Sequence, residues 1–162
     1  MAEVFGVPLS VGTLSPLERA TTEAVTVPVE AARTYVHAQA VAHLDETSWR
    51  QEDKRAWLWV AVTSGVTVFV VWMSRGGHVA RELLGETFSG ILVPNRYSAY
   101  TWYPVRWRQV CWAHVVCDVE AMRGRGGRSQ EIGDALLAQA HQMFAWWHQV
   151  REGTLKRSTL RS

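Results

Sequence analysis

The chain has 162 residues, of which 48% are hydrophobic and 20% charged, and its formal net charge is +2. This composition is typical of a globular domain with a buried core and excludes an intrinsically disordered chain. No uncharged apolar run is long enough to span a membrane, and the N-terminus lacks the pattern of a secretory signal. The two cysteines, Cys111 and Cys117, suggest no disulfide framework, so we expect a reducing, cytoplasmic location.

The first 40 residues are predicted to be mainly helical. Residues 1–14 are apolar with glycines and indicate the end of a preceding helix followed by a loop. Ser15 is expected to cap a helix that ends before Pro28, because proline lacks the N–H that a helix interior needs. A second helix is expected over about 29–40.

From residue 41 the hydrophobic period changes from helical to twofold. Residues 41–47 predict a strand whose polar side chains at positions 43, 45 and 47 share one face. Two further strands are expected over 55–63 and 66–74, with a tight turn between them. Three consecutive strands joined by short turns predict an antiparallel meander.

Helices and strands then alternate. A short amphipathic helix is expected over 78–84, a doubly buried strand over 90–93, a helical turn over 97–102, a strand over 108–112 and a helix over 114–122. After a loop rich in arginine and glycine, Ser129 is predicted to cap a long helix that runs to about residue 151.

This order of elements predicts an α/β fold of the ribonuclease H-like kind: a mixed sheet with a three-stranded antiparallel meander, alternating strands and helices, and flanking helices. In open sheets, functional groups collect where the ends of neighbouring strands diverge. Asp45, in the first strand, and Asn95, just after the fourth, are therefore expected to lie together.

Clustered arginines on flexible backbone suit a polyanion, although they are equally typical of a solvated loop. Candidate phosphate contacts occur in the loop after residue 122 and beside the two segments that hold Asp45 and Asn95. They are Arg123, Arg125 and Arg128 in the loop, and Arg50, Arg75 and Arg96 beside the site.

Three segments have a recognisable pattern: residues 43–50 (HLDETSWR), 90–100 (GILVPNRYSAY) and 111–114 (CWAH). With 57–60 (WLWV) and 74–76 (SRG), they resemble the transposases of the insertion-sequence-sixty-six family, in register from about residue 3 to the end of the chain. The resemblance implies a DDE catalytic domain, which binds DNA and uses Mg²⁺ to cleave and transfer DNA strands during transposition of a mobile element.

The resemblance assigns the first catalytic carboxylate, a metal ligand, to Asp45. The family's second acid falls on Asn95, with Pro94 in place of the usual small residue before it. The third acid, a downstream glutamate, belongs to a motif that this sequence does not reach. An amide at position 95 removes a negative charge from a site that must hold Mg²⁺. We therefore expect loss of the two-metal state and of DNA cleavage.

Other residues near these motifs have more than one interpretation. Glu46 is expected on the strand face opposite Asp45 and so is a poor substitute acid, whereas Asp118 and Glu120 could approach the site or be solvated helix charges. Cys111 and His114 could belong to a zinc site, but a structural, site-shaping role is favoured because ligands of matching kind are lacking. His43 is expected to be a neighbour that shapes the site or orders a metal-bound water.

Nine tryptophans are many for a chain of this length. Those in strands are expected to pack in the core, namely Trp57, Trp59 and Trp72. Four other aromatic residues are candidates for stacking on unpaired bases: Trp49, Tyr97, Tyr100 and Trp102.

The sequence thus predicts a helical segment (1–40), a partial ribonuclease H-like DDE core (41–122), and a basic loop with a long helix from an insertion region (123–162). The predicted function is that of a truncated DDE transposase catalytic domain, inactive alone, with DNA and full-length transposase copies as partners. It would be nucleoid-associated when bound to DNA. The alternative is a non-catalytic module that keeps the scaffold for DNA binding or protein interaction.

Overall fold

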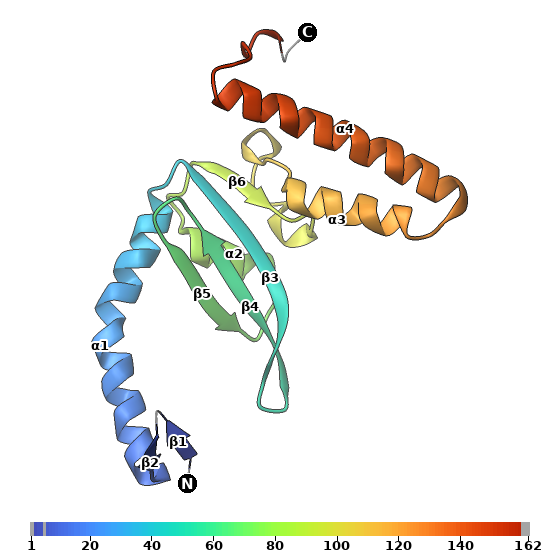
Figure 1. The fold of residues 1–162 in the computed structure, drawn as a ribbon. Coiled ribbons are helices and arrows are strands. Elements are labelled where there is room, and N and C mark those ends of the chain that lie inside the picture. The colour runs from blue at the N-terminus through green and yellow to red at the C-terminus, as the bar shows by residue number, and fades with distance from the viewer. Residues whose placement is uncertain (1, 5, 160–162) are drawn as a thin grey trace. The chain divides into compact units, whose positions relative to one another are not determined.

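The computed structural model describes residues 2–4 and 6–159 (Figure 1). The chain divides into two compact units, Met1–Gln109 and Val110–Ser162. The first unit contains the sheet and the second a helical hairpin, and each is described by itself.

The N-terminal region differs from the sequence prediction. Strands β1 (Ala2–Val4) and β2 (Val7–Leu9) form an antiparallel pair where the end of a helix was expected. A single helix, α1 (Val11–His37), follows, capped by Ser10 rather than Ser15. The Ser10 hydroxyl accepts a hydrogen bond of 3.2 Å from the backbone N–H of Thr13, which satisfies one of the free donors at the helix start.

The prediction that Pro28 divides this region into two helices is wrong, because Pro28 lies inside α1. Proline removes one backbone hydrogen bond, but this part of α1 is exposed, so water can satisfy the freed carbonyl. The C-terminal part of the helix packs on the core through Val36, whose side chain is fully buried. The helix therefore continues through Pro28, and its C-terminal part is held by packing against the core.

A mixed sheet forms the centre of the first unit. It contains β3 (Val41–Gln51), β4 (Lys54–Val62), β5 (Thr67–Trp72) and β6 (Ile91–Pro94) in the order β5-β4-β3-β6 within the described residues. The first three strands are antiparallel neighbours, and β6 lies parallel to β3. The predicted meander is therefore confirmed, and the fold is a mixed α/β fold.

The strand expected over 108–112 is not formed in the described chain. The short 3₁₀ helix η2 (Val105–Trp107) lies just before these residues. They form a single β-bridge to β6, between Arg108 and Leu92, in which the Gln109 N–H donates to the Leu92 carbonyl at 2.8 Å. Helix α3 (Trp112–Arg123) begins at the end of the expected strand. Residues with a strand-like pattern thus form only an isolated bridge, because the chain turns away from β6 and enters α3 a few residues later.

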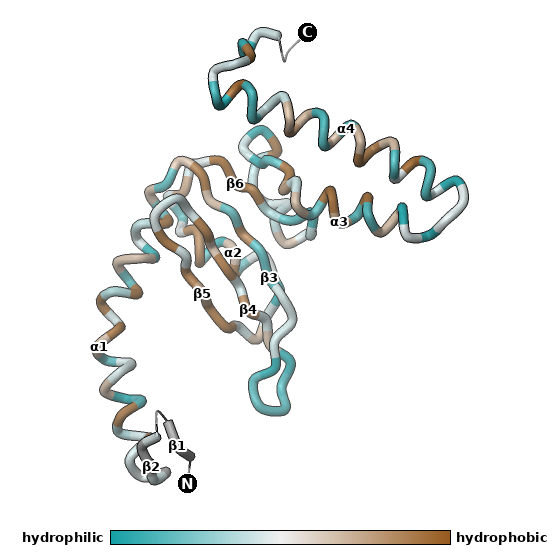
Figure 2. The backbone as a smooth tube through the Cα atoms, in the orientation of Figure 1, coloured by the Kyte–Doolittle hydropathy of each residue, from teal (hydrophilic) through white to brown (hydrophobic). Residues whose placement is uncertain are grey.

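The core lies on one face of the sheet, under helix α2 (Gly77–Leu84) and the 3₁₀ helix η1 (Ser98–Tyr100). Figure 2 shows the apolar character of β4, β5 and β6, whereas much of β3 is hydrophilic. Trp59 is fully buried, as predicted, and its indole N–H donates to the Ser74 carbonyl at 3.0 Å. Trp57 and Trp72 are partly buried and pack against the same cluster.

We expect Gly90→Ala to destabilise the protein by about 2 kcal/mol, as is typical of overpacking. A Cβ at this position would lie 2.5 Å from the Gln39 carbonyl oxygen and 2.7 Å from that of Ala40. These are backbone atoms at the start of the β3–β6 pairing, where Ile91 N–H donates to the Ala40 carbonyl at 2.8 Å, so they cannot move freely.

Urea unfolding of the Gly90→Ala variant measures this effect. Gly124→Ala is the matched control, since a Cβ there would lie at an ordinary 3.6 Å from its nearest neighbour, the Glu120 carbonyl oxygen, and its φ is −64°. We expect the control to be neutral or slightly stabilising. Equal unfolding midpoints for the two variants would contradict the close approach at Gly90.

The second unit is an antiparallel pair of helices, α3 and α4 (Gly127–Arg151). Helix α4 begins two residues before the predicted cap, Ser129, because Gly126 adopts a φ of 74° that reverses the chain there. Arg123 Nε lies 2.9 Å from an Asp134 carboxylate oxygen, and Trp112 packs edge-on against Phe144. No helix of the described chain combines the length and hydrophobicity that crossing a membrane requires.

Candidate functional site

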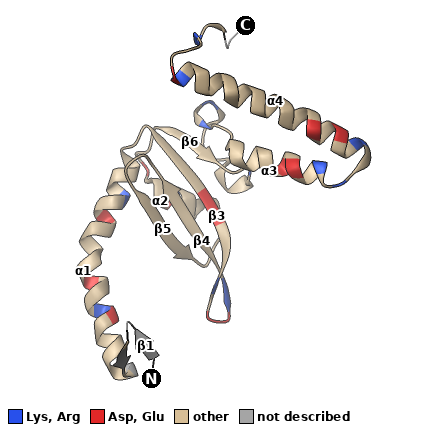
Figure 3. Ribbon diagram, in the orientation of Figure 1, with Lys and Arg blue, Asp and Glu red and all other residues tan. Residues whose placement is uncertain are grey.

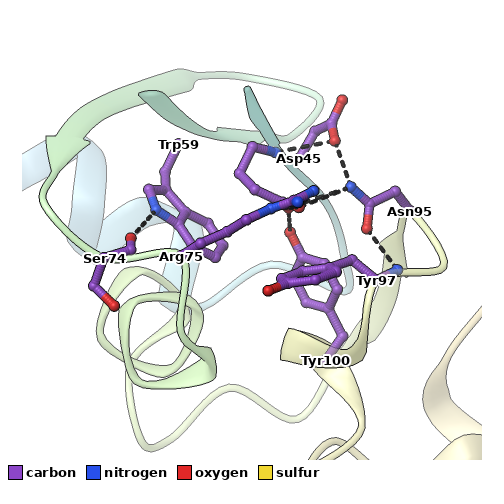
Figure 4. Close-up of polar contacts among 8 residues, drawn as sticks. Asp45, Trp59, Ser74, Arg75, Asn95, Tyr97 and Tyr100 are labelled. Carbon is purple, nitrogen blue, oxygen red and sulfur yellow. Dashed lines mark hydrogen bonds and ion pairs between the residues drawn. The ribbon is translucent and has the colours of Figure 1, made fainter. Parts of the chain in front are cut away.

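The structure brings Asp45 and Asn95 together. The β3–β6 pairing ends at Leu44 and Pro94, so the next residue of each strand is the first beyond the shared ladder. There the Asn95 side-chain amide donates a hydrogen bond of 2.8 Å to Asp45 Oδ1 (Figure 4). The same carboxylate oxygen accepts the backbone N–H of Glu46 at 3.0 Å.

The orientation of the Asn95 amide is fixed from both ends. Its Oδ1 accepts the backbone N–H of Tyr97 at 2.9 Å, which assigns the oxygen and therefore the nitrogen. The Nδ2 group donates to Asp45 and also lies 3.2 Å from both carboxylate oxygens of Glu46. Asn95 thus presents hydrogen-bond donors to two carboxylates.

Glu46 is the residue whose role the sequence did not reveal. Its side chain is fully buried and accepts hydrogen bonds from Arg75 (Nε at 3.1 Å and Nη2 at 2.8 Å) and from the Tyr100 hydroxyl at 2.5 Å. The predicted alternation holds, because Ala42, Leu44 and Glu46 point to the buried face. Although Glu46 lies on the strand face opposite Asp45, as predicted, Asn95 contacts both acids because it lies beyond the end of β6.

The Arg75 guanidinium completes this cluster. It lies 4.6 Å from the ring centre of Trp57 and 3.9 Å from that of Tyr97, and so combines its ion pair with two cation–π contacts. Its position follows from the chain path, because Arg75 lies in the connection from β5 to α2 and β5 ends level with Ser48, two residues from Glu46 on β3. A buried carboxylate requires such a partner, since an unpaired charge is costly in the core.

Tyr100 is a hydrogen-bond donor in this cluster. Burial, with the Glu46 hydrogen bond and negative charge added, raises the pKa of its hydroxyl far above the ordinary value. The phenol therefore stays protonated and donates to Glu46. The prediction that Tyr100 stacks on unpaired bases is wrong, because its ring is fully buried against Trp59.

A family model described as Transposase IS66 family matches residues 1–162 of the chain. The chain belongs to this family. No curated protein and no solved structure matches it.

Because DDE transposases use Mg²⁺, Asp45, Glu46 and Asn95 of this IS66 family chain are candidate ligands for that ion. The ion needs hard, anionic oxygen ligands in octahedral geometry. Among residues 2–4 and 6–159, no three His, Cys, Asp or Glu side chains are grouped to hold a metal. Glu46 is engaged by Arg75 and Tyr100, and Asn95 directs its N–H groups at both acids. These side chains do not fit the ion as arranged.

The other predicted site residues of the first unit lie around this cluster. His43 is exposed on β3, and Arg96 is exposed directly after Asn95. Arg50 lies farther along β3, in the hairpin with β4, where Trp49 is also exposed. Trp102 is half-buried, with Arg81 over its ring.

The remaining predicted residues belong to the second unit. Cys111 is the half-buried N-cap residue of α3, and His114 lies in its first turn. Three further residues follow in α3: Asp118, Glu120 and Arg123. Arg123 pairs with Glu120 at 3.3 Å as well as with Asp134. Arg125 and Arg128 are exposed at the turn into α4. Contacts of these groups with Asp45 or with DNA stay predictions.

Proposed function

We propose that this IS66 family chain has the scaffold of a DDE transposase catalytic domain and binds DNA without cutting it. The observation that supports this most strongly is the Asn95 amide, which donates to Asp45 and Glu46 where the family has its second acid. In this proposal the chain keeps a ribonuclease H-like arrangement, which the parallel placement of β6 beside the first strand of the meander supports.

The physical basis is a difference in charge. In metal-assisted phosphoryl transfer, carboxylates hold the ions that activate the nucleophile and stabilise the leaving oxygen. At position 95, amide hydrogens carry partial positive charge to the place where a negative ligand is needed. They also neutralise part of the charge of Asp45, the first acid of the pattern. The proposed partners are DNA at the nucleoid and full-length copies of the family's transposases.

We expect the purified chain to leave supercoiled plasmid DNA intact in the presence of Mg²⁺ or Mn²⁺. The reason is that Asp45 has the Asn95 amide in place of a second metal-binding acid. Agarose electrophoresis of nicked and linear products measures the outcome, with Asp45→Asn as the matched control. Cleavage by the wild type that the Asp45→Asn variant lacks would contradict the non-cleaving function.

A protein-interaction module is the second candidate. The α3–α4 hairpin has an apolar groove of about 430 Å³, whose lining includes Val115, Val119 and Met143. A two-helix unit buries few of its own side chains, so such a groove suits an apolar partner. A DNA titration at low salt separates the two candidates, because an interaction module has no need to bind DNA.

A further inference from the structure

Residues 49–56 form a two-stranded ribbon that projects from the sheet (Figure 1). The last pair between β4 and β5 is Trp57 with Trp72, and β6 pairs with β3 only as far as Leu44. Pairing of β3 with β4 continues to Gln51 and Lys54, without a third strand in the described chain. Apart from Ala56, the cross-strand partner of Trp49, which is fully buried, the residues of this β3–β4 ribbon are exposed, including Trp49 at 46%.

Two arginines lie directly opposite each other on the ribbon. Arg50 and Arg55 are cross-strand partners, an arrangement of like charges that destabilises a folded sheet. Among the described residues, no ion pair neutralises either of them. Figure 3 shows this basic segment on both strands next to an acidic turn. A costly pair of exposed charges is typical of a functional surface rather than of a stabilising one.

The basic face of the ribbon is continuous with the candidate site. Arg55 lies 5.5 Å from the ring centre of Trp57, whose ring also contacts Arg75 of the Glu46 cluster. Beyond Arg55, a shallow hollow of about 400 Å³ is lined by Ser48, Trp49, Arg50, Asp53 and Arg55. A row of alternating guanidinium groups and an aromatic ring, Arg75, Trp57 and Arg55, thus connects the candidate site to the ribbon.

We propose that the β3–β4 ribbon enters a groove of double-stranded DNA, with Arg50 and Arg55 contacting phosphates. The ribbon projects about three residues beyond the sheet, or roughly 10 Å at strand rise. The major groove of DNA is about 8.5 Å deep and admits a two-stranded ribbon. At its tip, Glu52 and Asp53 would face base edges, where carboxylates accept hydrogen bonds from cytosine amino groups. This inference rests on the DNA-binding function proposed above.

The test is a fluorescence-anisotropy titration of a labelled DNA duplex at several salt concentrations. The variant is Arg50→Ala/Arg55→Ala, and Arg19→Ala/Arg106→Ala is a control with the same charge change at exposed positions off the ribbon. We expect the ribbon variant to bind about tenfold more weakly, with a log–log salt slope shallower by about 2, since each phosphate contact contributes about 0.9. Its melting temperature is expected to be unchanged or raised, because the like-charge pair is gone. The control keeps the wild-type slope.

The outcomes distinguish the two proposals. Failure of the wild type to bind duplex DNA at low salt overturns both the DNA-binding function and the ribbon inference. If the wild type binds, an unchanged slope in the ribbon variant, with binding lost in Arg125→Ala/Arg128→Ala, overturns the ribbon inference alone. Equal competition by a single-stranded oligonucleotide also overturns groove insertion.

Discussion

Replacing Asn95 by aspartate is expected to lower the melting temperature by about 10 °C, and millimolar Mg²⁺ or Mn²⁺ to restore most of the loss. The carboxylate introduced by Asn95→Asp would keep the Tyr97 N–H as a donor to one oxygen. Its other oxygen would replace the amide nitrogen that is now 2.8 Å from Asp45 and 3.2 Å from Glu46.

The expected loss follows from the charges. The wild-type amide contributes hydrogen bonds to charged groups, each worth about 1.5–3 kcal/mol. In the Asn95→Asp variant these contacts become repulsive, and a net loss of about 3 kcal/mol corresponds to the stated shift in melting temperature. A divalent cation relieves the repulsion by binding between the carboxylates, so the variant gains a dependence on metal that the wild type lacks.

Thermal denaturation with and without the metal measures both effects, with Asn95→Ala as the control. That substitution removes the same hydrogen bonds without adding charge, so it is expected to destabilise the protein without metal rescue. If Asn95→Asp were as stable as the wild type and indifferent to Mg²⁺, the Asn95 amide would not be what excludes the ion.

The second large effect is expected for Glu46→Ala, which should destabilise the protein by about 3–5 kcal/mol. The Glu46 side chain is fully buried, whereas that of Arg75 is 35% exposed. Removal of the carboxylate leaves the Tyr100 hydroxyl buried without its acceptor and takes the ion-pair partner from Arg75. The connection from β5 to α2 and the 3₁₀ helix η1 would both lose their attachment to β3.

Equilibrium unfolding in urea measures this loss, and two variants provide controls. Glu46→Gln keeps an oxygen acceptor for Tyr100 but no charge for Arg75, so its destabilisation is expected to be intermediate. Glu30→Ala removes an exposed helical ion pair with Arg33 and is expected to cost less than about 0.5 kcal/mol. Similar values for Glu46→Ala and Glu30→Ala would show that the buried cluster is not a stabilising unit.

Local pattern was enough to predict most elements of the first unit. Twofold periodicity in residues 41–47 and the two following strands predicted the meander, and the apolar run before Pro94 predicted β6. These segments agree with the structure because side-chain alternation and turn residues act over a few positions. The same local rules failed at Pro28 and at residues 108–112, where exposure and the path of the chain decided the result.

The sequence by itself determined that the chain belongs to a transposase family and that position 95, where the resemblance predicted a negative charge, holds an asparagine. Only the tertiary structure decided what replaces that charge. Because β6 ends one residue before Asn95, its amide lies at the free edge of β3 and contacts acids from both strand faces. Strand alternation places Asp45 and Glu46 on opposite faces of β3, but the position of Asn95 at the sheet edge lets its single amide group hydrogen-bond to both.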